Sequence, residues 1–278
     1  MKFGSHVSIA GGIDKAPERA HSLGCECFQI FSRSPRGGKP PELTKELVDS
    51  FLSSRSKYSL TDYYIHTPYY INFASAKKEL RESASRIIRE ELERASIIGA
   101  GYIMTHLGSS KDVSRKEAVR MVADGISKAI DGSELSSLLL LENTAGQGAT
   151  IGDNFEELAE ILELVGDPDI GICIDTAHLL ASGYDIRDSK ALKQTLNIIS
   201  KTTGLNRVKL IHGNDSKADI GERKDRHEHI GKGKIGIDGF KAVLSSPELQ
   251  NLNMIAELPP DKVASDITLL KQLREELT

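Results

Sequence analysis

The stretch Gly171-Ile-Cys-Ile-Asp175-Thr-Ala-His178 decides the fold. Its apolar, largely β-branched run is typical of a buried strand in a parallel sheet, because helices cover both faces of such a strand. The run ends in the carboxylate of Asp175, and the imidazole of His178 follows three positions later. Ionisable groups at the end of a buried strand need a partner, and a metal ion is one such partner. We therefore ask whether other strands end in the same way.

Seven further segments have the composition of strands, and helical patterns separate them. In chain order the expected strands are residues 2–9, 26–31, 62–66, 102–106, 137–142, 171–175, 207–212 and 253–257. Eight strands alternating with helices predict an α/β fold, a single (β/α)₈ TIM barrel that forms one domain over residues 1–278. The alternative is an open doubly wound sheet, but no Gly-x-Gly-x-x-Gly follows the first strand, as its nucleotide-binding form would require.

Composition narrows the class of protein. The chain has 278 residues, of which 39% are hydrophobic, and no apolar run approaches the ~18 residues of a membrane span. No signal-peptide segment precedes the first strand, so we expect a soluble, cytoplasmic protein that does not bind membranes. The three cysteines, Cys25, Cys27 and Cys173, have neither a disulfide nor a zinc-knuckle spacing and are expected to be small buried hydrophobes.

The net charge of −4 argues against a nonspecific nucleic-acid binder, because such proteins are normally basic. Bound metal ions would change this conclusion. Three divalent ions would add six positive charges and bring the total to +2, with the added charge located where an anionic ligand approaches.

Metal-competent side chains end six consecutive predicted strands. They are His66, His106, Glu142, Asp175, His212 and Glu257. In a barrel these ends meet on the C-terminal rim, where active sites are built. Taken alone, each residue has two equally good interpretations. It could bind a metal ion, or it could be a polar side chain that hydrogen-bonds at a strand end or caps a helix. Carboxylates gathered at one rim, however, repel each other unless cations lie between them, so the set predicts a metal site.

Three more candidates lie beyond the strand ends. His178 follows Asp175, and Asp225 and His227 lie in a long charged loop at residues 213–236. Their i, i+2 spacing directs both side chains to one side of an extended segment. Glu228 and His229 leave the local assignment open, and a solvated loop is the alternative. A structureless loop of this length in a compact domain is unusual and often functional.

The types of ligand indicate the metal and the chemistry. Imidazoles mixed with carboxylates, without cysteine, suit zinc, with manganese or iron as substitutes. Nine candidate ligands are too many for one ion, so shared carboxylates imply a cluster. Paired ions about 3.5–4 Å apart typically serve displacement at phosphate esters, with metal-bound hydroxide as the nucleophile.

Five ordered segments resemble the endonuclease IV family, the zinc-dependent apurinic/apyrimidinic (AP) endonucleases of base-excision DNA repair. They are residues 66–75, 141–148, 174–178, 212–217 and 225–233, and the resemblance runs from Gly4 to about Pro259. It implies three zinc ions on the rim of a TIM barrel. The implied ligands are His66, His106 and Glu142 for the first ion, Glu142, Asp175, His212 and Glu257 for the second, and His178, Asp225 and His227 for the third.

The resemblance also implies the reaction, which is hydrolysis of the phosphodiester bond 5′ to an abasic site in duplex DNA by a monomeric deoxyribonuclease. The products would be a 3′-hydroxyl and a 5′-deoxyribose phosphate. Glu142 would be the catalytic residue, and Glu142 or a neighbour would orient the attacking hydroxide. Family members insert loop residues into DNA and flip the abasic nucleotide out. The residues at matching positions are Arg36, Tyr69 and Tyr70, although packing of both tyrosines against the barrel is the alternative. Basic rim residues that could grip phosphates are Arg33, Lys39, Lys217, Lys232 and Lys234.

Two other functions fit parts of the pattern. A sugar isomerase or epimerase of the xylose-isomerase-like type shares the barrel and the strand-end carboxylates, but gives His178, Asp225 and His227 no role. A non-catalytic lesion-binding protein would use the metal-lined rim only to hold phosphate, and an intact ligand set argues against it.

Overall fold

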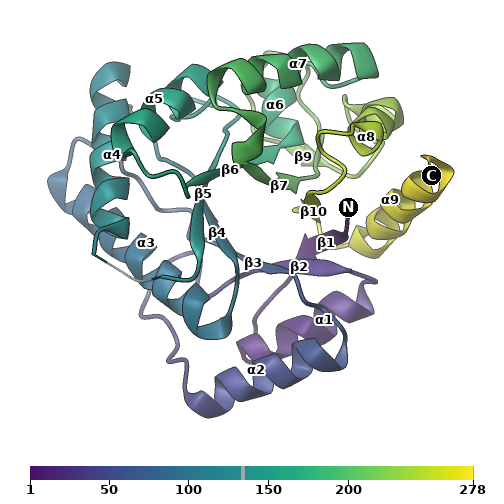
Figure 1. The fold of residues 1–278 in the computed structure, drawn as a ribbon, viewed down its shortest axis with the longest axis horizontal. Coiled ribbons are helices and arrows are strands. Elements are labelled where there is room, and N and C mark those ends of the chain that lie inside the picture. The colour runs from purple at the N-terminus through teal and green to yellow at the C-terminus, as the bar shows by residue number, and fades with distance from the viewer. Residues whose placement is uncertain (133–134, 278) are drawn as a thin grey trace.

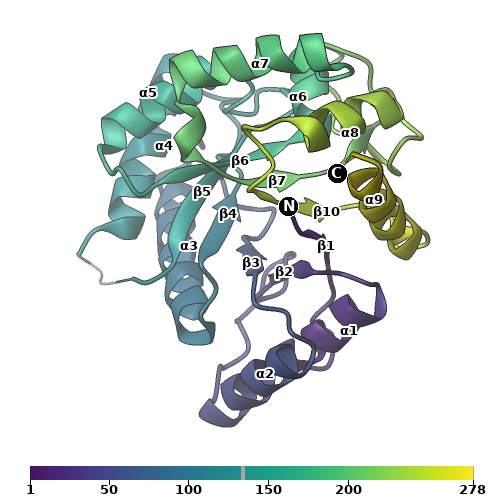
Figure 2. The ribbon, with the colours of Figure 1, turned by 45° about the vertical axis from the view of Figure 1, so that its right-hand side comes forward.

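The computed structural model describes residues 1–132 and 135–277. Eight parallel strands close into a barrel in the order β1-β10-β7-β6-β5-β4-β3-β2, and helices surround it (Figures 1 and 2). The strands are β1 (Phe3–His6), β2 (Cys27–Phe31), β3 (Tyr63–His66), β4 (Tyr102–Thr105), β5 (Leu138–Glu142), β6 (Gly171–Asp175), β7 (Val208–His212) and β10 (Asn253–Ala256). This arrangement confirms the predicted (β/α)₈ TIM barrel.

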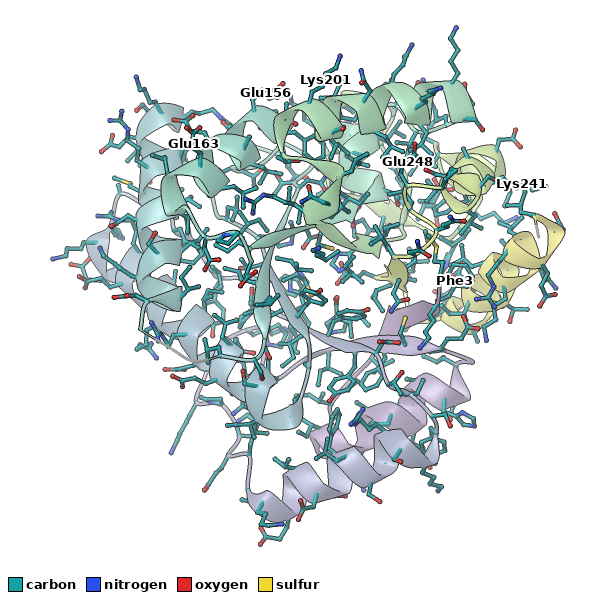
Figure 3. All side chains as sticks on the ribbon, viewed as in Figure 1. Phe3, Glu156, Glu163, Lys201, Lys241 and Glu248 are labelled. Atoms are coloured by element: carbon teal, nitrogen blue, oxygen red, sulfur yellow. The ribbon has the colours of Figure 1, made fainter. Side chains whose placement is uncertain are left out.

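Helices follow the strands in the expected order. They are α1 (Ala16–Ser22), α2 (Lys45–Lys57), α3 (Lys78–Ile98), α4 (Arg115–Ile130), α5 (Phe155–Val165), α6 (Thr176–Ser182), α7 (Ser189–Thr202), α8 (Gly236–Ser245) and α9 (Val263–Leu277). Charged side chains such as Glu163 and Lys201 project outward from this ring (Figure 3). No helix in the described part of the chain is both long and apolar enough to cross a bilayer.

Local signals in the sequence set several helix ends. Ser114 caps α4, its hydroxyl accepting a hydrogen bond from the Glu117 backbone N–H, and Asn154 caps α5, its side chain accepting from the Glu157 backbone N–H. Helix α3 ends at Gly99, whose φ of 80° lies in the left-handed region that glycine adopts without strain. These caps determine where the outer helices begin and end.

Two elements differ from the prediction. Helix α6 was not predicted, and it begins directly after β6 because the Asp175 carboxylate accepts a hydrogen bond from the His178 backbone N–H. The loop at residues 213–236 is not structureless, since β8 (Asp215–Ser216) and β9 (His227–Glu228) pair in an antiparallel ribbon. Both elements are too short to produce a hydrophobic period, which is the signal that sequence reasoning uses.

The barrel interior consists of layers of side chains. One fully or nearly buried layer takes one residue from each of seven strands, namely Cys27, Tyr64, Met104, Leu140, Cys173, Leu210 and Ile255. A larger apolar core fills the space between the barrel and the helices. Because strand side chains alternate, the residue two positions after each member of the layer points into the barrel one level nearer the C-terminal rim. This level holds the candidate site.

All three cysteines are buried, as predicted. Cys27 and Cys173 belong to the interior layer, and Cys25 packs in the outer core. Burial raises the pKa of the Cys173 thiol to about 12, and that of Cys25 to about 11. Both thiols therefore stay protonated at neutral pH, and they are packing residues rather than nucleophiles.

Candidate metal centre

The six predicted strand-end residues lie one level above the interior layer. Each follows a member of that layer by two positions, so the pleat of every strand directs its side chain into the barrel mouth. Three of them, His66, His106 and Glu142, offer ligand atoms within 4.8 Å of one another. A second group within the same distance contains Glu142 again, with Asp175, His212 and Glu257.

Glu142 is the residue that the two groups share. Its Oε2 lies 3.2 Å from Nε2 of His66 and 3.7 Å from Nε2 of His106. Its Oε1 lies 3.0 Å from Nδ1 of His212. Glu142 is fully buried, and its two oxygens face different imidazoles, which is the geometry of a bridging carboxylate.

A third group combines Asp175, His178 and His227 within 4.8 Å. Helix α6 positions His178, and the β8–β9 ribbon positions His227. Asp225, half-exposed on the same loop, lies 3.3 Å from Nε2 of His178 and 3.4 Å from Nε2 of His227. The structure therefore gathers all nine candidate ligands, although the third group within 4.8 Å contains Asp175 where Asp225 was expected, and Asp225 faces it from the loop.

The nitrogen atoms at the third group fit a metal ion. The Nδ1 atoms of His178 and His227 bond to the backbone carbonyls of Asn143 and Glu257, at 2.9 Å and 3.0 Å. Among the described residues, the buried Nε2 atoms of both rings have no hydrogen-bond partner. Two atoms bound tetrahedrally by zinc lie about 3.3 Å apart, close to the separations of these nitrogens from Asp225. The donor set and the spacing both suit a divalent cation.

The buried charges shift each other's ionisation. Burial alone would raise the pKa of Glu142, but the surrounding imidazoles, His106 and His212 foremost, hold it well below its usual value. Burial opposes the charge on His178 too, yet Asp175 and Asp225 outweigh it and raise the pKa of His178 to about 10. Burial likewise works against Asp225, but its pairing with His178 lowers the Asp225 pKa to about 2.

This pKa of His178 predicts proton release when a metal binds. Below about pH 10 the metal-free ring carries a proton that coordination must displace, so affinity at this group should rise with pH. Calorimetric zinc titrations in buffers of different ionisation enthalpy should detect about one proton released from this ring per ion bound near neutral pH. The variant His178→Gln should release about one proton fewer, and equal release from both proteins would contradict the assignment.

Two residues at the same level were missed by sequence reasoning. His6 on β1 and Gln29 on β2 lie beside Glu257, and Gln29 is fully buried. Gln29 follows the interior-layer residue Cys27 by two positions, as the candidate ligands do on their own strands. The same period-two rule applied to β2 would have found it, but a glutamine was not scored because it is not a usual metal ligand.

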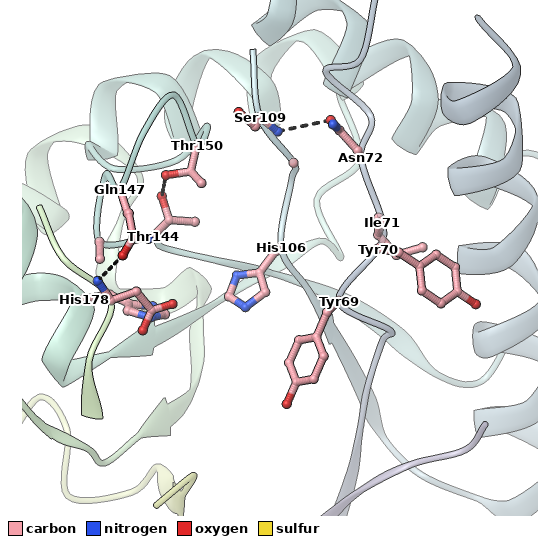
Figure 4. A pocket seen from close by; sticks show the side chains of 13 residues that line it. Tyr69, Tyr70, Ile71, Asn72, His106, Ser109, Thr144, Gln147, Thr150 and His178 are labelled. Carbon is pink, nitrogen blue, oxygen red and sulfur yellow. Dashed lines mark hydrogen bonds and ion pairs between the residues drawn. The ribbon is translucent and has the colours of Figure 1, made fainter. Parts of the chain in front are cut away.

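Five of the predicted DNA-contact residues are exposed, namely Arg36, Tyr69, Tyr70, Lys217 and Lys232. Tyr69 is 67% exposed and Tyr70 42%, although the Tyr69 ring also contacts Phe31 on strand β2. A cavity of about 340 Å³ lies between Tyr69, His106, Gln147 and Asp225 (Figure 4), and the Gln147 side chain accepts a hydrogen bond from the Asp225 backbone N–H. Tyr69 and Tyr70 line this cavity together with the candidate ligands His106, His178 and Asp225, so it lies next to the candidate metal centre.

One predicted phosphate contact is wrong. Arg33 is 3% exposed, and its guanidinium pairs with Glu91 and, at 2.8 Å, with Glu90 on helix α3. The two carboxylates neutralise the guanidinium, and burial keeps it away from the surface, so Arg33 cannot reach a phosphate. It fixes the loop after β2 to α3 instead.

Comparison with known proteins places the chain in a family. The model for xylose isomerase-like TIM barrels matches residues 17–277. A probable endonuclease 4 from Methanosphaerula palustris is 40% identical over 278 residues, covering 99% of this chain and 97% of the relative. Another, from Carboxydothermus hydrogenoformans, is 37% identical and covers 100% and 98%.

Solved structures agree with these relatives. The crystal structure of endonuclease IV from Thermus thermophilus has a TM-score of 0.88 at 34% identity, covering 99% of this chain and 100% of that one. A D-tagatose 3-epimerase-like protein has a TM-score of 0.77 at 19% identity, which shows a shared fold alone. Nearly complete coverage by endonuclease IV relatives, at up to 40% identity, decides between these two groups. This chain is a member of the endonuclease IV family of xylose isomerase-like TIM-barrel proteins.

Proposed function

We propose that this chain is a metal-dependent AP endonuclease that hydrolyses the phosphodiester bond 5′ to an abasic site in duplex DNA. The products would be a 3′-hydroxyl and a 5′-deoxyribose phosphate. The observation that carries the proposal is the pair of buried Nε2 atoms on His178 and His227, which make no hydrogen bond and both face the carboxylate of Asp225. They belong to the group that a sugar epimerase of this fold would not need, and that a three-ion nuclease site requires.

We infer three zinc ions, with Mn²⁺ or Fe²⁺ as possible substitutes. The residues that would hold them are His66, His106 and Glu142 for the first, Glu142, Asp175, His212 and Glu257 for the second, and His178, Asp225 and His227 for the third. Bound ions would supply Lewis-acid stabilisation of the phosphate oxygens and lower the pKa of water to give a nucleophile near neutral pH.

The chain's own residues supply the rest of the chemistry. Glu142, with one oxygen towards His66 and His106 and the other towards His212, orients the attacking oxygen and joins the first two ligand groups. Buried side chains hold these groups before substrate arrives, so little reorganisation is needed at the moment of reaction.

The exposed rim residues would hold the DNA. Lys217 and Lys232 would contact phosphates, and Arg36 would contact the backbone near the lesion. Tyr69 packs edge-on against Phe31 at a centroid distance of 5.2 Å while two-thirds of its surface stays exposed. Contact with Phe31 holds the ring in place, while its exposed surface stays free to stack on a base. A wedge that replaces lost base stacking needs both properties.

Tyr69→Ala tests the wedge. We expect kcat/KM on abasic duplex DNA to fall about tenfold or more, because one base stack on an aromatic ring is worth about 1–3 kcal/mol. The matched control is Ile97→Ala, which removes an apolar side chain 54% exposed near the end of α3, away from the strand C-termini. Equal effects of the two substitutions in steady-state cleavage assays would contradict the role of Tyr69.

The oligomeric state and the cellular compartment follow from the ligand set and the cysteines. We infer a monomer, because one chain carries the complete candidate ligand set. We infer a cytoplasmic protein, because its three thiols are free and buried, which is typical of a reducing compartment.

The decisive experiment combines two measurements on purified protein. Elemental analysis gives the metal content, and a duplex with one abasic analogue, labelled at its 5′ end, reports the site of cleavage. The proposal expects three zinc equivalents and a single cut 5′ to the lesion. One metal equivalent and an intact duplex would favour the epimerase-like function, and tight binding without cleavage would indicate a lesion-binding protein.

A further inference from the structure

Strand β2 is the neighbour of a ligand strand, yet it contributes neither carboxylate nor imidazole at the ligand level. Gln29 occupies its position there and is fully buried. An amide buried among ionic groups is costly unless its donors and acceptor are all paired. Its contacts therefore show what this side chain does in the barrel mouth.

Every polar position of the Gln29 amide has a partner. Nε2 donates to Oε1 of Glu257 at 2.5 Å and lies 3.0 Å from Nδ1 of His6. Oε1 lies 2.9 Å from Nε2 of His212. Two of these partners, Glu257 and His212, belong to the second ligand group, and no backbone group separates them from the amide.

The chemistry of the partners fixes the orientation of the amide. The Glu257 carboxylate only accepts hydrogen bonds, so the –NH₂ of Gln29 must face it. A flipped amide would set two acceptor oxygens against each other. Oε1 therefore faces His212, and because Oε1 only accepts, Nε2 of His212 must carry the hydrogen.

That hydrogen determines which atom of His212 is available to a metal ion. With Nε2 protonated, the lone pair of the neutral ring lies on Nδ1. Nδ1 is the atom that faces the other ligands, 3.0 Å from Oε1 of Glu142 and 3.4 Å from Oε2 of Glu257. The amide thus selects the ring nitrogen that points into the second group.

Three of the other four candidate imidazole ligands achieve this selection differently. His66, His178 and His227 each direct Nδ1 to a backbone carbonyl and leave Nε2 for the site. A side-chain substitution does not remove a backbone carbonyl, so these three hydrogen bonds do not depend on the identity of a neighbouring side chain. His212 instead presents Nδ1 and depends on a side chain, so its tautomer can be changed by a single substitution at Gln29.

We propose that Gln29 is a positioning residue of the second metal site, which selects Nδ1 of His212 as the ligating atom and aligns Glu257 through the same amide. The inference rests on the proposed metal centre and extends it by a residue that binds no ion itself. Partners of this kind fix the orientation of ligands, and their loss typically costs about 10–100-fold in metal affinity.

Two variants separate the functions of the amide. Gln29→Leu removes every hydrogen bond at similar volume. Gln29→Glu keeps an acceptor for His212 but turns a second carboxylate towards Glu257. The matched control is Cys27→Ala on the same strand and face, because Cys27 is equally buried and belongs to the layer beneath the ligands.

Metal affinity and tautomer are the two readouts. Zinc competition titrations should show one of three ions bound about 10–100-fold more weakly in Gln29→Leu, and at least as weakly in Gln29→Glu. Cys27→Ala should keep wild-type affinity even where thermal unfolding shows lower stability. Long-range ¹H–¹⁵N spectra of the zinc-loaded wild type should show His212 protonated at Nε2.

Each contrary result has a defined meaning. Wild-type zinc affinity in Gln29→Leu, or a zinc-loaded wild type with His212 protonated at Nδ1, would overturn the role of Gln29 alone. If Gln29→Leu does not fold, Gln29→Glu and the wild-type spectrum still decide. A wild type that binds no zinc would overturn both this inference and the proposed function, which keeps the two failures distinguishable.

Discussion

Replacing Glu142 with glutamine is expected to lower cleavage of abasic duplex DNA by about 10³-fold or more while leaving DNA binding nearly unchanged. The substitution keeps the shape of the side chain but exchanges one carboxylate oxygen for an –NH₂ group. Either His66 and His106 or His212 would then face a donor where they now face an acceptor. The residues proposed to grip DNA lie on the exposed rim, so the loss should appear in kcat rather than in affinity.

Single-turnover cleavage and equilibrium binding to the same duplex measure the two effects separately. The matched control is Glu163→Gln, an identical chemical change on the exposed surface of α5 (Figure 3). It should leave metal content, binding and turnover unchanged. Turnover by Glu142→Gln near that of the wild type would exclude Glu142 as the shared, catalytic carboxylate.

Replacing Glu91 with glutamine is expected to lower the free energy of unfolding by about 3 kcal/mol, because it removes one partner of a buried ion pair. Glu91 is fully buried on α3, accepts a hydrogen bond from the Ser32 hydroxyl at 2.6 Å and pairs with the Arg33 guanidinium. Arg94 continues the network and donates to the Ser32 carbonyl at 2.7 Å. Without the charge of Glu91, the buried Arg33 keeps only Glu90.

Denaturant unfolding of the metal-loaded protein measures this change. Glu93→Gln is the matched control, since Glu93 is exposed on the same helix two residues away. Metal content should stay at the wild-type value in both variants, because Glu91 contacts none of the candidate ligands. An unfolding free energy for Glu91→Gln equal to that of the control would show that the pair contributes nothing measurable.

The ends of the strands could be predicted because they depend on short-range rules. A buried apolar run identifies a strand, and the pleat then determines which residue at its end points into the barrel. Glu142 and Asp175 could be located in this way to the residue. His106 and Glu257 lie one residue beyond the ends of their strands, yet they keep the inward direction because the interior layer precedes each by two positions.

What the sequence did not reveal depends on contacts between distant segments. Arg33 belongs to a loop rich in basic and small residues. It becomes a buried structural group only because α3 packs against this loop and Glu91 on α3 pairs with its guanidinium. The β8–β9 ribbon forms through pairing of Ser216 with His227 across a long excursion of the chain. Gln29 acquires its importance only from Glu257, which lies 228 residues further along the sequence.

The distribution of the candidate ligands over separate strands has a consequence for biosynthesis. The second group joins residues from Glu142 on β5 to Glu257 at the end of β10, and β10 closes the barrel by pairing with β1. A chain emerging from the ribosome therefore lacks the complete second group until Glu257 has been made. Capture of a metal ion by this group would thereby be linked to closure of the ring, and an ion held by the full set would stabilise the closed chain over its unfinished or opened forms.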